Sequence, residues 1–201
     1  MTVDVEAWTR SIDQFLAVAR AFIQTSGNNA FLRGIRGEIL TLRQILQTHR
    51  ETLSLVNAQL GYGGSSRKGH DIMIRIGDRE VRLDCKEKTE GDHWVRLHGR
   101  TFADVTVDEL TRQQHVEMRT DFRHDFYYIF VDSVGFSETG EASFYLLSDK
   151  EAKETIGSIY KRRLEGKKRI RNENSDDFWV YPAEIGAFSD NSLERLPLRG
   201  T

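Results

Sequence analysis

The chain has 201 residues, of which 38% are hydrophobic and 30% charged, and its formal net charge is −2. This length suits one domain with a substantial core, and the composition excludes an intrinsically disordered chain. No apolar run is long enough to cross a bilayer, and the single cysteine, Cys85, excludes an internal disulfide framework. We therefore expect a soluble, cytoplasmic protein with no membrane partner, folded as a single domain over residues 1–201.

Two helical patterns open the chain. Apolar residues recur with helical spacing over residues 5–24, and a second, longer helical pattern covers residues 30–58. On a helical wheel that starts at Ile35, Glu38 lies inside the apolar arc. A buried carboxylate is either paired or bound to a cation, because an unpaired buried charge is costly. The alternative is a rim glutamate whose aliphatic stem covers the core.

A Gly/Ser-rich loop at residues 61–66 separates these helices from a predicted hairpin. Apolar and polar residues alternate over 71–76 and again over 79–86, which predicts two strands that each have one apolar face. The two residues between them begin with glycine, as a type II′ hairpin turn requires. This turn fixes the register, so that Asp71 faces Asp84.

Two carboxylates at directly opposite positions repel each other, and a strand pair tolerates them when a cation lies between them. Carboxylate oxygens are the ligands that Mg²⁺ prefers. Lys86 follows Asp84 by two residues, so its ammonium group is expected beside the metal. The alternative is a solvated face on an edge hairpin, in which Arg82, Lys86 and Lys88 neutralise the acids.

The rest of the chain alternates strands and helices. We predict a strand near residues 93–97, a weak helix over 106–120, a buried strand over 126–131 and a further strand over 142–147. Asp149 is expected to cap a helix over 150–164, and the tail from residue 172 is expected to be irregular. This order of elements indicates a mixed α/β domain.

Asp71, followed thirteen residues later by Asp84-Cys85-Lys86, with Glu38 on the preceding helix, resembles the PD-(D/E)xK nuclease superfamily. The resemblance covers roughly residues 30–132, and His70 stands where the family usually has proline. It implies a restriction-endonuclease-like core, in which a mixed central sheet is flanked by helices. The nuclease core would span about residues 30–147, followed by a basic segment over 150–201.

The same resemblance implies an enzyme that hydrolyses phosphodiester bonds of DNA with Mg²⁺, for which Mn²⁺ is expected to substitute. Asp71 and Asp84 would bind the metal, with the main-chain carbonyl of Cys85 as a further ligand. Glu38 would bind the metal directly or through water. Lys86 would position the attacking water and help to deprotonate it.

Basic residues provide candidates for nucleic-acid contacts. Residues 150–171 hold nine Lys and Arg against three Glu, a local balance of +6. Such side chains would bind backbone phosphates and supply affinity more than sequence preference. The alternative is a solvated helix face with a basic tail. The candidates are Arg67, Lys68, Lys88, Lys161, Arg162, Arg163, Lys167, Lys168 and Arg169.

The leading interpretation is an endonuclease that acts on double-stranded DNA, in restriction or phage defence. Cutting both strands with one site per chain would require a homodimer or a partner nuclease subunit. One rival interpretation is a catalytically silent nucleic-acid-binding or assembly module with the same fold. Another is a phosphatase with an acidic metal site.

Overall fold

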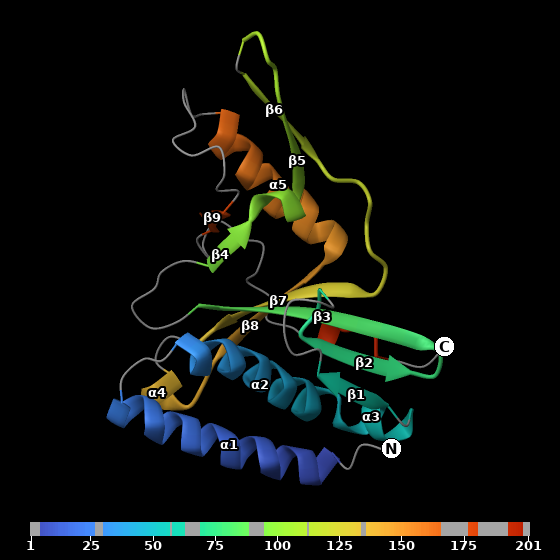
Figure 1. The fold of residues 1–201 in the computed structure, drawn as a ribbon. Helices are drawn as coiled ribbons and strands as arrows, with labels where there is room; N and C mark the ends of the chain where they lie inside the picture. Colours follow the sequence, from blue (N-terminus) through green and yellow to red (C-terminus); the bar gives the residue numbers. More distant parts are fainter. Residues whose placement is uncertain are drawn as a thin grey trace.

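A five-stranded mixed sheet forms the centre of the structure, with strands in the order β1-β2-β3-β7-β8 (Figure 1). The strands are β1 (Gln59–Tyr62), β2 (Ile72–Ile76), β3 (Arg79–Lys88), β7 (Phe126–Asp132) and β8 (Ser143–Ser148). β3 and β7 are parallel, and the other neighbouring pairs are antiparallel. This computed structural model describes residues 5–26, 30–56, 58–62, 69–88, 95–111, 113–133, 136–165, 177–180 and 193–198.

Helices cover one face of the sheet: α1 (Val5–Ser26), α2 (Ala30–Thr48), the short α3 (Arg50–Leu55) and α4 (Phe136–Thr139) (Figure 1). The apolar side chains of β2 and β3 pack against α2 in one core cluster, which also contains Leu193 from the 3-10 turn η3 (Leu193–Arg195). Alternation along β3 sends Leu83 into this core and turns Asp84 to the other face.

The other face of the sheet carries α5 (Asp149–Glu165) and the hairpin β5 (Ala103–Val107) and β6 (Gln114–Met118) (Figure 1). The pair β4 (Val95–His98) and β9 (Asp177–Val180) and the 3-10 turn η1 (Gly99–Thr101) lie there too. A second core cluster fills the space between these elements and the sheet. β7 contributes side chains to both clusters, which explains its continuous apolar sequence. The expected fold class, a mixed sheet flanked by helices, is therefore confirmed.

The predicted hairpin register is correct. Ile72 pairs with Leu83, and Ile74 pairs with Val81. Gly77, the first turn residue, has φ +58°, as a type II′ turn requires. The sequence alone therefore placed every β2 side chain on its correct face.

The helix predicted over residues 30–58 is interrupted at His49 and ends at Leu55. His49 leaves the helical conformation with φ −114° and ψ 20°, and its ring Nε2 lies 2.6 Å from the carbonyl oxygen of Leu193. His49 thus separates α2 from the short helix α3. The chain then enters β1, a strand that the glycine-rich composition of this segment concealed.

The weak helix predicted over 106–120 is also wrong, because these residues belong to the β5–β6 hairpin. The Asp108 carboxylate accepts hydrogen bonds from the amides of Leu110 (2.9 Å) and Thr111 (2.7 Å) and so holds a turn. Val116 is buried while the residues on either side of it are exposed, which is a strand pattern.

Ser148, not Asp149, caps α5. The Glu151 amide donates to Ser148 Oγ (3.2 Å), and the Ser148 amide donates to Glu151 Oε2 (2.8 Å), which is a capping box. Asp149 is instead buried beneath two cationic side chains. No helix within the described ranges has the length and apolar character that crossing a membrane requires.

Candidate active site

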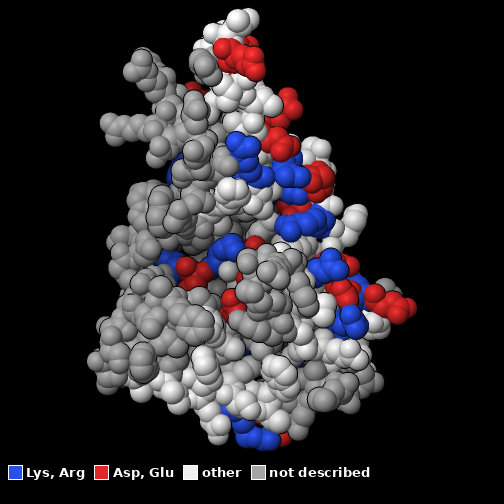
Figure 2. Space-filling model, in the orientation of Figure 1, with Lys and Arg blue, Asp and Glu red and all other residues white. Residues whose placement is uncertain are grey.

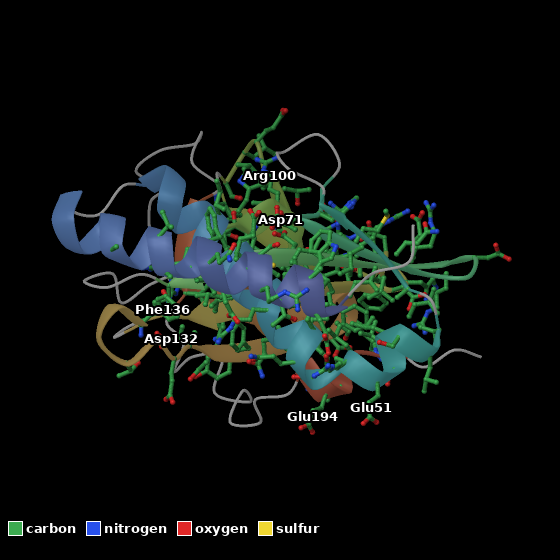
Figure 3. The ribbon with its side chains drawn as sticks, turned by 90° about the horizontal axis from the view of Figure 1, so that it is seen from below. Glu51, Asp71, Arg100, Asp132, Phe136 and Glu194 are labelled. Atoms are coloured by element: carbon green, nitrogen blue, oxygen red, sulfur yellow. The ribbon has the colours of Figure 1, made fainter. Side chains whose placement is uncertain are left out.

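Asp71 lies where the β2–β3 ladder ends, just before β2, and is labelled in Figure 3. Its amide donates to the carbonyl of Leu83 (2.8 Å), one residue out of the regular register. Its carboxylate Oδ2 accepts a hydrogen bond from the amide of Cys85 (2.7 Å). The side chain of Asp71 is therefore held across β3, beside the residues that carry the predicted chemistry.

Asp84 and Lys86 lie on the face of β3 that is turned away from α2, and they form an ion pair. Burial raises the pKa of the Asp84 carboxyl, and the charge of Asp71 and a hydrogen bond with its side chain raise it further. Burial alone would lower the pKa of Lys86, but the charges of Asp84 and Asp71 raise it above its ordinary value. The structure thus brings two carboxyl groups and one ammonium group together.

Cys85 points to the opposite face, toward α2, where burial raises the pKa of its thiol well above the ordinary value. The negative charges of Asp71, Asp84 and Glu38 raise the pKa of this thiol further. Glu38 reaches this point with a buried Oε2 atom. Glu38 therefore lies on the α2 side of β3, whereas the Asp84 side chain lies on the other face of this strand.

A buried ion pair attaches α2 to β3 next to Glu38. Arg36 Nε donates to Glu87 Oε1 (2.7 Å) and Arg36 Nη2 to Ser133 Oγ (3.0 Å). The amide of Gly37 donates to Glu87 Oε2 (3.0 Å). The side chains of Arg36 and Glu87 are only 3% and 5% exposed. Local sequence patterns do not predict this pair, because the contact joins residues that are far apart in the chain.

The donor set is of the kind that binds Mg²⁺, but its present arrangement is not a complete coordination shell. In the part of the chain that the structure describes, no three His, Cys, Asp or Glu side chains are grouped to hold a metal ion. Lys86 provides the positive charge beside Asp84, and Asp71 is bonded to the Cys85 amide. Two adjacent carboxyl groups, one with a raised pKa, nevertheless match what a divalent cation stabilises.

Tyr128 lies next to this site, which the sequence did not predict for this residue. The parallel pairing of β3 with β7 places it beside Asp84. Its hydroxyl accepts a hydrogen bond from Arg123 Nη2. Burial raises the pKa of Tyr128, so the hydroxyl is neutral over the physiological range.

The structure describes only some of the residues that are predicted to contact nucleic acid. Lys88 lies two residues beyond Lys86 and bonds Asp132 (2.9 Å), which Figure 3 labels. Lys161, Arg162 and Arg163 lie in the last turns of α5, and Lys161 is 3.7 Å from Glu165. Their contacts with nucleic acid stay predictions. Outside the described residues are Arg67, Lys68, Lys167, Lys168 and Arg169.

No family model and no curated protein matches the chain. Among solved structures, it is similar to a bacterial homing endonuclease, I-Ssp6803I, at 12% sequence identity. The similarity covers 63% of this chain and 74% of that one, with a TM-score of 0.36. This similarity is too low to support an activity. Fold and site together define a mixed α/β domain with a carboxylate–lysine site on its central hairpin.

Proposed function

We propose that the chain is a divalent-metal-dependent endonuclease that hydrolyses phosphodiester bonds of DNA. The observation that carries this proposal is the Asp71–Asp84 pair with the Lys86 ammonium bonded to Asp84. Acids held together with perturbed pKa values cluster at functional sites.

Asp71, Asp84, Glu38 and the carbonyl oxygen of Cys85 would hold the cation, Mg²⁺ or Mn²⁺. When bound, the cation neutralises charge on the scissile phosphate and lowers the pKa of an attacking water. Lys86 orients that water and stabilises the negative charge that develops on the phosphate.

The test is cleavage of supercoiled plasmid with Mg²⁺ and with EDTA. We expect the wild-type chain to cut only with metal, and Asp71→Asn, Asp84→Asn and Lys86→Met to be inactive while they retain the fold by circular dichroism. The matched control is Arg82→Gln. Arg82 lies on the same face of β3, two residues before Asp84, and its side chain is 49% exposed and paired with Glu80. This variant should cut like the wild type.

Wild-type cleavage by Asp71→Asn, Asp84→Asn or Lys86→Met would overturn the proposed site. Equal cleavage with and without metal would overturn the metal dependence. Hydrolysis of small phosphate esters without cleavage of DNA would make the protein a phosphatase instead.

We further propose double-stranded DNA as the substrate and restriction or phage defence as the role. A chain with one site cuts one strand at a time, so concerted cleavage requires a homodimer or a partner nuclease subunit. Linear product formed without a nicked intermediate, together with a dimer in sedimentation, would support the homodimer. Nicked circles alone would contradict it.

A catalytically silent nucleic-acid-binding or assembly module is the second candidate. It is favoured by the Lys86–Asp84 ion pair, which satisfies the charge without a metal, and by the lack of a three-ligand group among the described residues. DNA binding without cleavage in either Mg²⁺ or Mn²⁺ would select this alternative.

A further inference from the structure

A cavity of about 380 Å³ opens on the α5 side of the sheet. Its lining includes His98, Arg100, Arg119, Arg123 and Lys153, with Asp121 as its carboxylate. These side chains come from β4, η1, the segment between β6 and β7, and α5. On the face shown in Figure 2, Lys and Arg side chains form a column, with acidic side chains among them, that descends to the level of the sheet. The cavity is large enough for a phosphate group and has the charge that attracts one.

Arg123 is held in one orientation by its surroundings. Its Nε (2.9 Å) and Nη2 (2.8 Å) donate to Asp149 Oδ1, and Nη2 also donates to the Tyr128 hydroxyl. The centre of the guanidinium lies 3.4 Å from the ring centroid of Phe126. The hydrogen bonds to Asp149 and Tyr128 use Nε and Nη2 of Arg123, and among the described residues none of them uses Nη1. A guanidinium fixed in this way is preorganised to bind an oxyanion with its remaining N–H groups.

The carboxylates at the cavity are already neutralised. Arg119 donates to Asp121 through Nε (2.9 Å) and Nη2 (2.6 Å), and these bonds hold the pKa of Asp121 well below its ordinary range. Lys153 lies 2.8 Å from Asp149, which is 1% exposed. Asp104 is 4.0 Å from Arg119 and is 68% exposed, so solvent screens it. The four cations that line the cavity therefore exceed the nearby carboxylates of Asp121, Asp149 and the exposed Asp104 by one charge.

The cavity is connected to the candidate active site through one side chain. Tyr128 is the β7 neighbour of Asp84, and Arg123 donates to its hydroxyl. Adjacent strands lie about 4.8 Å apart. Tyr128 therefore lies beside Asp84, and its hydroxyl contacts Arg123, which lines the cavity. Both sites lie on the same face of the sheet.

We propose that this cavity binds a backbone phosphate of the DNA whose scissile phosphate lies at Asp84 and Lys86. The identification of DNA as the bound molecule rests on the proposed function, whereas the anion site rests on the residues that line the cavity. A phosphate fixed here sets the register of the backbone relative to Asp84 and so decides which bond is cut.

The test measures binding without cleavage. A fluorescein-labelled DNA duplex is titrated with the full chain in EDTA, at several salt concentrations, by fluorescence anisotropy. We expect Arg100→Gln and Arg100→Gln/Arg119→Gln to weaken binding several-fold, and the slope of log K against log salt to fall by about 0.9 for each phosphate that the variant no longer neutralises. The matched control is Arg50→Gln. Arg50 lies on α3 on the helical side, is 60% exposed and pairs with Glu6. It should bind within experimental error of the wild type.

A second measurement separates the two possible sources of phosphate. Inorganic phosphate is titrated into ¹⁵N-labelled chain, and the arginine Nε–H resonances are followed. Saturable shifts at Arg100 and Arg123, together with weaker DNA binding by the variants, support the proposal. Shifts with phosphate but unchanged DNA binding by the variants overturn DNA as the occupant. No shifts and unchanged binding overturn the anion site itself. The proposed nuclease function fails separately, if Asp84→Asn cuts plasmid like the wild type.

Discussion

Removal of the Arg36 guanidinium should destabilise the fold more than most single changes, because it leaves the Glu87 carboxylate buried. Glu87 would keep its hydrogen bonds from Gly37 and Ser133 but lose its only opposite charge among the described residues. Breaking a buried ion pair from one side costs about 3–5 kcal/mol. For a chain of this length, each kcal/mol lowers the Tm by about 2–4 °C. Arg36→Met should therefore lower the Tm by about 6–20 °C.

A double-mutant cycle separates the pair from simple loss of packing. Burial raises the pKa of Glu87, which shows that its charged form is destabilised there. In the absence of Arg36, a neutral side chain at this position should therefore cost less free energy than a buried, unpaired carboxylate. We expect Glu87→Gln to restore part of the stability that Arg36→Met removes. Urea unfolding followed by circular dichroism measures all four proteins, and the coupling energy is the difference between the double variant and the sum of the singles.

Arg50→Ala provides the comparison for an exposed pair. Arg50 and Glu6 are 60% and 64% exposed, so this variant should lose less than about 1 kcal/mol. The reasoning would be refuted if Arg36→Met unfolded at the wild-type urea concentration. Additive effects of the two single changes would refute it as well, because the ion pair would then contribute nothing of its own.

Three further changes test other parts of the structure. Gly99→Ala places a Cβ 2.2 Å from the ring of buried Tyr160, so we expect a loss of about 1–3 kcal/mol in urea unfolding. Asp125→Asn removes a carboxylate whose pKa is lowered by hydrogen bonding to Arg79. At neutral pH the wild type should be more stable than this variant by about 1 kcal/mol. This difference should vanish as the pH falls through the pKa of Asp125 in the folded protein, because only the ionised carboxylate is stabilised. Asparagine also accepts the positive φ of this position, 51°, so thermal melts across acidic pH isolate the charge. Gly77→Ala, at φ +58°, should cost about 1–2 kcal/mol and shift the chemical unfolding midpoint without loss of the sheet.

The sequence predicted the β2–β3 hairpin well because its information is local. A two-residue turn and strict alternation define the register, and the register brings Asp71 near Asp84. The final detail was not predictable: the Asp71 amide bonds one residue out of register, and its carboxylate bonds the amide of Cys85. The juxtaposition is therefore confirmed, whereas the roles of Asp71, Asp84 and Lys86 stay predictions.

Contacts between segments that are far apart in the chain could not be predicted from the sequence. The pairing of Asp84 with Tyr128 follows from the parallel β3–β7 ladder, which local periodicity does not encode. The cavity at Arg123 could not be predicted either, because its lining residues come from several separate segments of the chain. The β5–β6 hairpin was missed because its turn is made by an Asp108 side chain and not by a glycine or proline signal.

β3 and β7 are adjacent in the sheet, yet the chain between them makes an excursion that includes the β5–β6 hairpin (Figure 1). The tip of this hairpin, where Leu110 is 96% exposed, projects away from the sheet. The entropy cost of closing a loop grows slowly with its length, so this projection can lengthen, shorten or be replaced without moving Asp84 relative to Tyr128. The length and sequence of the hairpin tip are thus independent of the β3–β7 pairing that places Tyr128 beside Asp84.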